Sequence, residues 1–370
     1  MTKMLVKING QLEGFELNFQ HEFNSKGITV LYGPNGSGKS TIISAIAGFT
    51  NNLDITVKLD DIVIDGKKTL PPHKRPFGTM FQDPILFEHL NVNENLNFAL
   101  SRSKLKFKHK ITKENLIENL ALNELLKRYP SNLSGGEKLR IALARTLLTQ
   151  PEYLLLDEPM SDIDIRYKAK LLFFLKKINR QFKIPILYVS HSIEEISQIA
   201  DQIILIDNGK KIEYGSTENI LNSDKFQRLI GKFEASSIIE GVVSSINELL
   251  NVTVLNINGQ ELIVPGRPGF KDEIVRVRIR SRDVIVSKLK INFPIIENEL
   301  IGEILNIQTE KKTAYSELII SLNKMKKNSD LQILRARMTT FNLKKLKLYK
   351  NDKIFIYIST VSIDRQAYQY

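Results

Sequence analysis

The chain contains no cysteine among its 370 residues. Disulfides, thiolate nucleophiles and cysteine-ligated zinc are therefore excluded, although this absence is compatible with almost any compartment. No run approaches the roughly 18 consecutive apolar residues that a membrane-spanning helix needs. The first residues, MTKMLVKING, also lack the apolar stretch of a secretory signal. We therefore expect a cytosolic chain that does not itself span a membrane.

The composition is that of a globular protein, with 42% hydrophobic and 25% charged residues. At about 150 residues per domain, the length suggests two or three domains. Lys and Arg number 53 against 41 for Asp and Glu, which gives a net charge of +12. Such an excess is compatible with a nucleic-acid partner or an anionic membrane face. It is spread over both halves of the chain, so charge alone does not distinguish these partners from a solvated surface.

Short apolar runs alternate with helix-like patterns in the first part of the chain. The runs that indicate strands are residues 27–32, 153–156, 185–189 and 202–206. Strands separated by helices favour a mostly parallel sheet covered on both faces. Between residues 91 and 129 the leucine spacing suits helices and there is no strand-like run. We therefore predict a helical subdomain at about residues 85–150.

The pattern changes near residue 235, where short alternating strands replace the helical stretches. Residues 239–246 (IEGVVSSI) resemble residues 300–307 (LIGEILNI), and residues 275–284 resemble residues 354–363. This repetition predicts a duplicated small β-barrel. We expect a first domain at residues 1–235, a first OB-like barrel unit at 236–292 and a second at 293–370.

A glycine-rich segment carries the strongest functional signal. Residues 33–40, GPNGSGKS, fit the pattern G-x-x-x-x-G-K-[ST] and lie between a strand-like run and a helical pattern. The glycines let successive backbone N–H groups point at phosphate oxygens, and the next helix directs its N-terminus at the same anion. Lys39 supplies a full positive charge, and the Ser40 hydroxyl can bind Mg²⁺. The predicted nucleotide-binding residues are Gly33, Pro34, Asn35, Gly36, Ser37, Gly38, Lys39, Ser40 and Thr41.

Two carboxylates follow an apolar run in YLLLDEP, residues 153–159. Ligands of an α/β sheet bind at the carboxyl ends of its strands. We expect Asp157 to hold Mg²⁺ through water, and Glu158 to orient and deprotonate an attacking water molecule.

A second phosphate-directed turn lies in NLSGGEKLR. Ser134, Gly135 and Gly136 precede a helical pattern, so their N–H groups can also face an anion. One phosphate chain rarely needs two such turns from one subunit. The economical solution is a head-to-tail dimer in which each turn closes over the partner's nucleotide.

In this order and spacing, GPNGSGKS, LSGGE and LLLDEP resemble the nucleotide-binding subunits of ATP-binding-cassette (ABC) proteins over about residues 4–230. The resemblance implies a P-loop α/β fold with an antiparallel β-subdomain and a helical subdomain. It also implies that Gln82 is a Mg²⁺ ligand that faces the membrane subunit, and that His191 contacts the γ-phosphate. Asp164 would cross the dimer interface. The implied catalytic set is Glu158, His191, Lys39 and Gln82, the implied Mg²⁺ ligands are Ser40, Gln82 and Asp157, and the implied signature is Ser134, Gly135, Gly136 and Glu137.

Three features depart from the family pattern. Leu139 stands where glutamine is usual in the signature, and Asp162 and Ile163 replace small or leucine residues. The aromatic residue that stacks on adenine is not evident. Phe15 is our candidate, and an ordinary core role for Phe15 fits its sequence context equally well.

Within the family, the chain is most similar to the ATPases of molybdate importers, on MFQDPILFEHL, LLLDEPMSDIDI and IPILYVSHSIEEI. The second tail unit resembles molybdate-binding (TOBE/MOP-like) domains. Ser359 stands where related units carry a lysine, and Arg280 occupies the equivalent place in the first unit. The oxyanion candidates are Thr339, Thr340, Ser359 and Arg280; a purely structural or dimerising tail is the alternative.

The resemblance therefore implies an ATPase subunit that uses ATP and Mg²⁺ to energise import, with molybdate or tungstate as the expected solute and candidate regulatory ligand. Expected partners are a second copy, two membrane permease subunits contacted near residues 82–95, and a separate substrate-binding protein. We expect a peripheral location at the cytoplasmic face of the inner membrane and no nucleic acid. The alternatives are an importer of sulfate, iron, sugar or polyamine, a soluble cassette ATPase acting on nucleic acid, and a regulatory oxyanion-binding protein.

Overall fold

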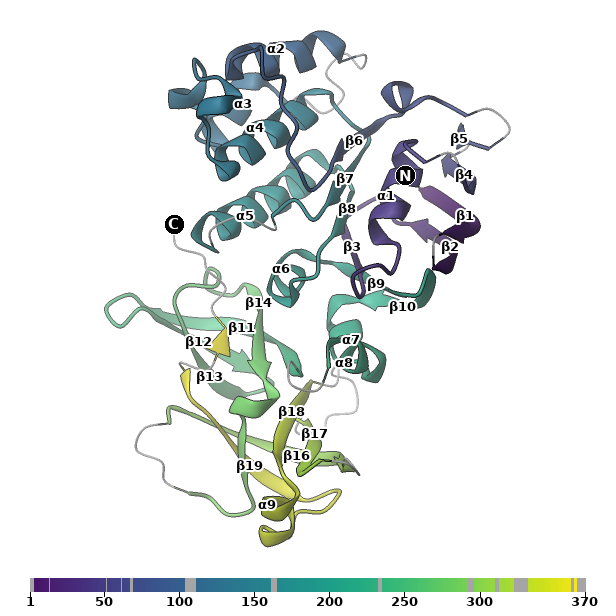
Figure 1. The fold of residues 1–370 in the computed structure, drawn as a ribbon. Helices are drawn as coiled ribbons and strands as arrows, with labels where there is room; N and C mark the ends of the chain where they lie inside the picture. Colours follow the sequence, from purple (N-terminus) through teal and green to yellow (C-terminus); the bar gives the residue numbers. More distant parts are fainter. Residues whose placement is uncertain are drawn as a thin grey trace. The chain divides into compact units, whose positions relative to one another are not determined.

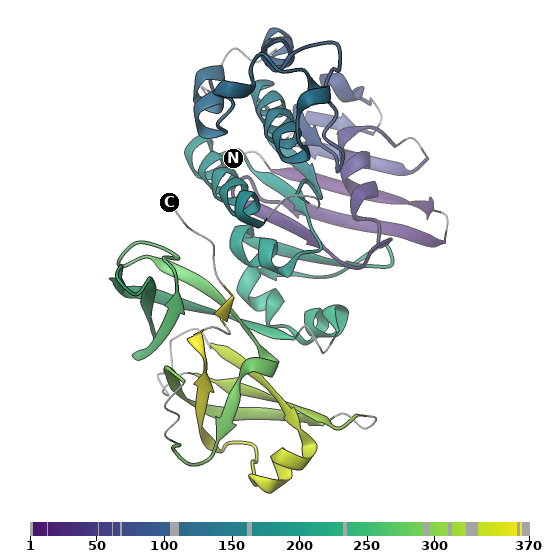
Figure 2. The same cartoon turned by 60° about the vertical axis from the view of Figure 1, so that its left-hand side comes forward.

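The computed structural model describes residues 3–12, 14–50, 52–60, 62–66, 69–103, 111–160, 165–231, 235–291, 296–309, 313–322, 332–360 and 363–364. Two compact units make up the chain, Met1–Thr217 and Glu218–Tyr370 (Figures 1 and 2). Within the described ranges, no helix has the length and apolar character needed to cross a membrane. Asp164, the expected interface residue, lies outside the described residues, as do Asp162 and Ile163.

The first unit is built on one ten-stranded sheet. The strand order is β5 (Ile62–Asp65), β4 (Asp54–Leu59), β1 (Met4–Leu12), β2 (Phe15–Phe23), β10 (Lys210–Ser216), β9 (Gln202–Asp207), β3 (Ile28–Tyr32), β8 (Ile186–Val189), β7 (Tyr153–Asp157) and β6 (Phe77–Met80). From β9 to β6 all pairings are parallel, whereas β1, β2, β4 and β5 pair antiparallel. The predicted α/β fold with an antiparallel β-subdomain is confirmed.

Helices cover the parallel part of this sheet. In Figure 1, α1 (Lys39–Ala47) lies on one face, and α5 (Ile165–Phe182) and α6 (Ile193–Ile199) lie on the other. Every residue of β3, β7 and β8 is buried, as expected for strands covered on both faces. Leu187 and Val189 share a core cluster with Ile42, Ile43 and other residues of α1. Alternation along β8 therefore directs Tyr188 away from α1, towards the opposite face.

A helical subdomain lies between β6 and β7. It contains α2 (Val92–Arg102), α3 (Lys113–Asn119) and α4 (Gly135–Leu148), with short 3₁₀ turns at Asn123–Leu125 and Pro130–Asn132 and another before β6 at Pro72–Lys74. Both α2 and α4 begin with a capping box, made by Asn91 with Glu94 and by Ser134 with Glu137. These reciprocal bonds satisfy two orphan N–H groups at each helix start.

The second unit begins with two short helices, α7 (Thr217–Leu221) and α8 (Asp224–Ile230), followed by two five-stranded sheets. The first sheet has the order β13 (Gln260–Pro265), β12 (Val252–Ile257), β11 (Ser236–Asn247), β14 (Ile274–Arg280) and β20 (Ile363–Asp364). The second has the order β15 (Ile285–Ser287), β19 (Lys353–Ile358), β16 (Asn298–Thr309), β17 (Tyr315–Ser321) and β18 (Ile333–Thr339). A 3₁₀ turn at Ser281–Asp283 precedes β15, and α9 (Thr340–Lys345) follows β18.

The strands of the two sheets interleave across residue 292, where we expected a boundary between barrel units. β15 pairs with β19 of the second sheet, and β20 returns from the end of the chain to pair with β14 of the first. Both sheets contribute to one hydrophobic core that includes Ile239, Leu255, Leu318 and Ile356. The sheets are therefore not two independently closed units, because each takes a strand from the other's sequence range.

Side-chain amides join the two sheets where no strand ladder does. The Asn298 amide, 1% exposed, accepts from the Ile263 N–H at 2.6 Å and donates to the Ile263 carbonyl at 3.0 Å. Gln260 makes the same pair of bonds with the backbone of Ile301, at 2.7 and 3.0 Å. Each amide replaces one backbone partner, so the polar edges of β13 and β16 stay satisfied inside the unit.

Candidate ATP-binding and hydrolysis site

The glycine-rich loop connects β3 to α1, as the motif requires. Gly36 and Gly38 adopt φ values of +79° and +97°, the left-handed region that favours glycine. At Gly33 a Cβ atom would lie 2.0 Å from the carbonyl oxygen of Ile206 in β9, so only glycine fits. Around Gly36 there is no atom within 4 Å of an added Cβ. The loop is thus held tightly by the sheet at its start and is open at its centre, where a phosphate would lie.

Lys39 curls back over this loop from the first turn of α1. Its ammonium donates to the carbonyl oxygens of Gly33 and Pro34, at 3.0 and 2.9 Å. The residue is only 5% exposed, and burial lowers the pKa of Lys39, with Glu158 and Asp157 opposing the shift. The cation therefore lies within the loop, next to the two carboxylates at the end of β7.

Ser40 and Asp157 meet at the carboxyl edge of the sheet. The Ser40 hydroxyl donates to Oδ1 of Asp157 at 3.1 Å. Burial raises the pKa of Asp157, and the hydrogen bond from Ser40 opposes that shift. Hard oxygen ligands of this kind suit Mg²⁺, which takes few protein ligands and completes its shell with phosphate and water. The two residues thus fit a Mg²⁺ site beside the phosphate loop.

Glu158 and His191 form a second pair at the ends of the neighbouring strands β7 and β8. Nδ1 of His191 lies 3.0 Å from Oε2 of Glu158, the distance of a hydrogen bond in which the ring N–H donates. Glu158 has φ of +43°, unusual for a residue with a side chain. Its N–H donates to the Val189 carbonyl at 3.1 Å, which holds this turn against β8. The His191 side chain is 59% exposed, so the pair opens to solvent at the loop.

Two other predicted residues flank the loop. Gln82 is exposed and follows the end of β6. Phe15 is half-buried and packs against the core cluster of α1, and its ring atoms lie 3.4 Å from the position of a Cβ at Gly38. Phe15 is therefore adjacent to the nucleotide loop and also contacts the core, so both expected roles fit its place.

The signature residues begin α4 in the helical subdomain. The Glu137 carboxylate accepts from the Ser134 N–H at 2.7 Å and from the Ser134 hydroxyl at 2.8 Å. These bonds lower the pKa of Glu137, the backbone bond most strongly. An added Cβ at Gly135 or Gly136 would have no neighbour within 4 Å. Leu139, the departure from the family pattern, is 2% exposed and contributes to the core of the subdomain.

Asn95 and Arg145 stabilise the segment after Gln82, and sequence reasoning gave neither a role. Asn95 is fully buried; its Oδ1 accepts from the Phe87 N–H at 3.0 Å, and its amide donates to the carbonyls of Phe87, Leu90 and Asn91. Arg145 donates to the Ile85 carbonyl, and its guanidinium lies 4.9 Å from the centre of the Phe87 ring. The segment also presents Ile85, 71% exposed. A polar Asn within a helical pattern carries no signal of these loop contacts.

The four oxyanion candidates lie on different elements of the second unit. Thr339 caps α9. The hydroxyl of Thr340 lies 3.0 Å from the hydroxyl of Ser316. Ser316 pairs with Thr309, at one end of β16. Ser359 directly follows β19. The last residue of β19 pairs with Asn298, which is at the other end of the 12-residue strand β16. Arg280 ends β14 in the other sheet. The register thus places Thr340 and Ser359 near opposite ends of β16, and all four residues remain candidates for an oxyanion site.

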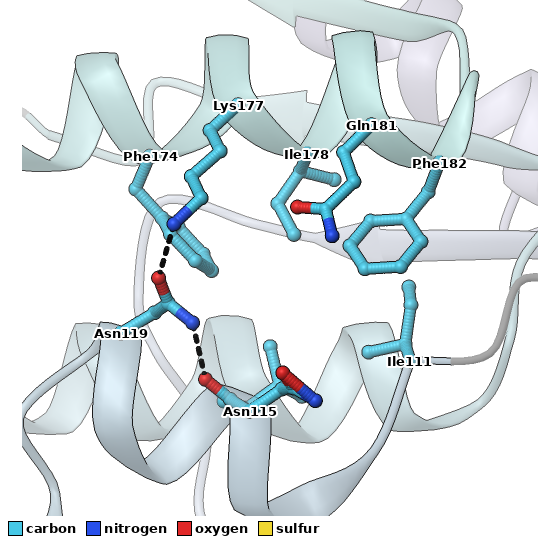
Figure 3. A pocket seen from close by; sticks show the side chains of 9 residues that line it. Ile111, Asn115, Asn119, Phe174, Lys177, Ile178, Gln181 and Phe182 are labelled. Atoms are coloured by element: carbon cyan, nitrogen blue, oxygen red, sulfur yellow. Dashed lines mark hydrogen bonds between the residues drawn. The ribbon is translucent and has the colours of Figure 1, made fainter.

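A small cavity of about 90 Å³ lies between α3 and α5 (Figure 3). Lys177 of α5 donates to the Asn119 side chain across its rim at 2.7 Å, and Phe174 and Ile178 line its wall. None of its lining residues belongs to the predicted nucleotide site. The cavity lies where the helical subdomain meets α5, which covers the ten-stranded sheet.

Comparison with known proteins agrees with this geometry. Residues 17–161 match the family model described as ABC transporter. A structure titled as the ADP conformation of an ATP-binding cassette of an ABC transporter has a TM-score of 0.53 and 23% identity, covering 62% of this chain and 98% of that one. A component of the cbiONQ ABC transporter complex from Clostridium perfringens has a TM-score of 0.52 and 24% identity, covering 61% and 92%. The fold and the phosphate loop define an ATP-binding-cassette ATPase.

Comparison with curated proteins identifies the family within the ABC ATPases to which the chain belongs. The molybdenum import ATP-binding protein ModC of Pectobacterium atrosepticum is 33% identical over 95% of this chain and 97% of its own length. The protein of the same name from Haemophilus influenzae is 31% identical over 97% of this chain and 99% of its own. The chain belongs to this family of importer ATPases, the molybdenum import ATP-binding proteins, whose activity is ATP hydrolysis coupled to transport.

Proposed function

We propose that the chain hydrolyses ATP to drive import of molybdate or tungstate across the cytoplasmic membrane, at whose inner face it lies peripherally. The observation that carries the catalytic part is the Glu158–His191 pair at 3.0 Å, next to Ser40 and Asp157 at the same sheet edge. The solute assignment is supported by full-length relatives named for molybdenum import. An importer of sulfate, iron, sugar or polyamine is the alternative for the same site.

The proposed roles follow from charge and position. Lys39 and the N–H groups at the start of α1 bind the β- and γ-phosphates, where they offset the charge that builds up during transfer. Ser40, Asp157 and Gln82 would hold Mg²⁺, which supplies additional charge neutralisation on the phosphates. Glu158 takes a proton from the attacking water. His191 fixes the Glu158 carboxylate by its hydrogen bond and lies where it can contact the γ-phosphate.

Dimer closure is the proposed source of mechanical work. Ser134 and the N–H groups of Gly135 and Gly136, at the start of α4, would bind the γ-phosphate held by a second copy of the chain. The Glu137 carboxylate holds the Ser134 hydroxyl and would have to release it in the closed dimer. Asp164 is proposed at the same interface. Two ATP molecules would then be enclosed between two copies.

Two membrane permease subunits, supplied with solute by a separate binding protein, are the proposed partners of that motion. The surface from Gln82 to Asn95 is the proposed contact, because its exposed Ile85 and half-buried Phe87 sit on a segment stabilised by Arg145. The second unit, residues 236–292 with 293–370, is proposed as a duplicated pair of barrels that exchange strands. Molybdate or tungstate is its proposed regulatory ligand.

The decisive experiment for catalysis is Glu158→Gln in the full chain. The amide keeps the size of the side chain but cannot take the proton, so ATP binding should persist while turnover falls by a factor of roughly 100 or more. Glu152→Gln, which neutralises a carboxylate at the opposite end of β7, is the matched control. Unchanged turnover in Glu158→Gln would exclude this residue as the base.

The solute needs a separate assay. Calorimetry of the full chain with molybdate, tungstate and sulfate tests the regulatory ligand, and uptake of each anion by the complex with its permease tests the transported solute. Uptake of another solute without uptake of molybdate would refute the assignment, even if ATP hydrolysis is normal.

A further inference from the structure

A buried carboxylate lies behind the loop that carries His191. Glu195 of α6 is 4% exposed. Its Oε2 accepts from the Tyr188 hydroxyl at 2.8 Å and from the Ser190 hydroxyl at 2.7 Å, and its Oε1 lies 2.7 Å from the ammonium of Lys168 in α5. Both oxygens are therefore engaged. An ionised carboxylate at this depth is stable only because it is paired and hydrogen-bonded in this way.

The contacts alternate along the chain around His191. Tyr188 and Ser190 point towards α5 and α6 to meet Glu195, whereas Val189 joins the core cluster of α1 on the other face. His191, two residues beyond the end of β8, instead reaches Glu158. Ser190, which bonds to Glu195, and His191, which bonds to Glu158, are adjacent in the chain, so this short segment links the position of one carboxylate to that of the other.

The residues on both sides of His191 are fixed through the same carboxylate. The Ser190 hydroxyl, which donates to Glu195, accepts from the Ser192 N–H at 3.0 Å. The Ser192 hydroxyl in turn accepts from the Glu195 N–H at 3.3 Å and caps α6. This closed circuit of three residues leaves the His191 backbone little freedom, although its side chain is exposed.

We propose that Glu195 is a positioning residue for ATP hydrolysis, which holds His191 at hydrogen-bond distance from Glu158. The proposal rests on the catalytic roles of Glu158 and His191 given above. Lys168 completes the arrangement, since its ammonium balances the buried charge and ties the loop to α5, near the start of that helix.

Glu195→Gln is the direct test. Its amide group cannot accept hydrogen bonds from Tyr188, Ser190 and Lys168 together, because one of its two polar atoms is now a donor. We expect kcat of the full chain to fall roughly 10- to 100-fold, the loss that follows when a reacting group is displaced by about 1 Å. ATP affinity should stay within about twofold of wild type, because the phosphate loop takes its contacts from β3 and α1.

The matched control is Glu194→Gln, which removes the same charge from the adjacent, exposed residue of α6. Ser190→Ala is the second variant, in case Glu195→Gln folds poorly. It opens the circuit but leaves the Glu195 carboxylate paired with Lys168 and Tyr188, so the same loss of kcat is expected without loss of the buried ion pair.

A spectroscopic readout separates positioning from general damage. The chain has five histidines, so the imidazole NMR signals of labelled protein can be assigned with His191→Gln. We expect the His191 signal to shift or broaden in Glu195→Gln and Ser190→Ala, with the other four unchanged. An unmoved His191 signal, or an unchanged kcat, overturns the proposal. If wild type itself fails to hydrolyse ATP, or Glu158→Gln retains full turnover, the proposed function fails instead.

Discussion

Arg75 anchors the far end of the helix that carries the phosphate loop, and its replacement by Met tests how that helix is held. The guanidinium caps α1 by donating to the carbonyls of Ile46 and Ala45, at 2.7 and 3.2 Å. It also donates to the Leu70 carbonyl at 2.8 Å and pairs with Asp65 at 2.6 Å. The cation thus lies at the negative end of the α1 dipole and links the helix to β5.

The expected cost follows from burial. The side chains of Arg75 and Asp65 are 2% and 10% exposed, so Arg75→Met leaves a carboxylate without its counter-ion in the interior. Removing one member of such a pair costs about 3–5 kcal/mol. Asp65 keeps hydrogen bonds from the Gly66 N–H and the Thr69 hydroxyl, at 2.9 and 2.8 Å, which limit the loss. We expect the free energy of unfolding of the first unit to fall by about 4 kcal/mol.

Hydrogen exchange of α1 amides measures this quantity for the first unit alone. A loss of about 4 kcal/mol predicts exchange faster by a factor of roughly a thousand. The double variant Arg75→Met with Asp65→Asn removes the unpaired charge and should recover at least about 2 kcal/mol. Lys74→Met, an exposed neighbour, should change exchange little. A loss below about 1 kcal/mol, or no recovery in the double variant, would refute the argument.

Two further predictions concern other buried polar residues. Burial lowers the pKa of His21 from 6.5 to about 4, so the unfolded chain takes up this proton first and stability falls as pH drops through that interval. His21→Leu should therefore make the free energy of unfolding less dependent on pH between 6.5 and 4 in urea titrations; an unchanged slope would contradict this. Asn95→Leu should speed hydrogen exchange of the Phe87 amide about tenfold or more without weakening ATP binding, because this N–H loses its buried acceptor; unchanged exchange would argue against that role for Asn95.

The sequence predicted the parts of the site that depend on local order along the chain. The loop from Gly33 to Ser40 has its strand before it and its helix after it, and YLLLDEP ends a buried strand with Asp157 and Glu158. Because parallel strands place their carboxyl ends at one edge, these local patterns also predict that Ser40 and Asp157 come close together. The structure places them 3.1 Å apart.

Contacts between distant side chains could not be predicted, since they leave no periodic pattern in the sequence. Arg75 is one basic residue among 53 Lys and Arg, and only the packing of β5 against α1 shows that it is buried. The exchange of β15 and β20 between the tail sheets depends on pairings of two or three residues, too short to detect from alternation. The strand register that separates Thr340 from Ser359 could not be predicted for the same reason.

Glu195 illustrates why such contacts matter for chemistry. Its side chain lies on the α5 and α6 face of β8, whereas Lys39, Ser40 and Asp157, the proposed phosphate and Mg²⁺ ligands, make their contacts beside the phosphate loop. A change at Glu195 can therefore reach Glu158 through the backbone around His191. Defects in hydrolysis and in ATP binding should then separate, because the residues proposed to bind phosphate belong to α1 and its loop. A variant on the α6 face that weakened ATP binding as strongly as turnover would contradict this separation of hydrolysis from ATP binding.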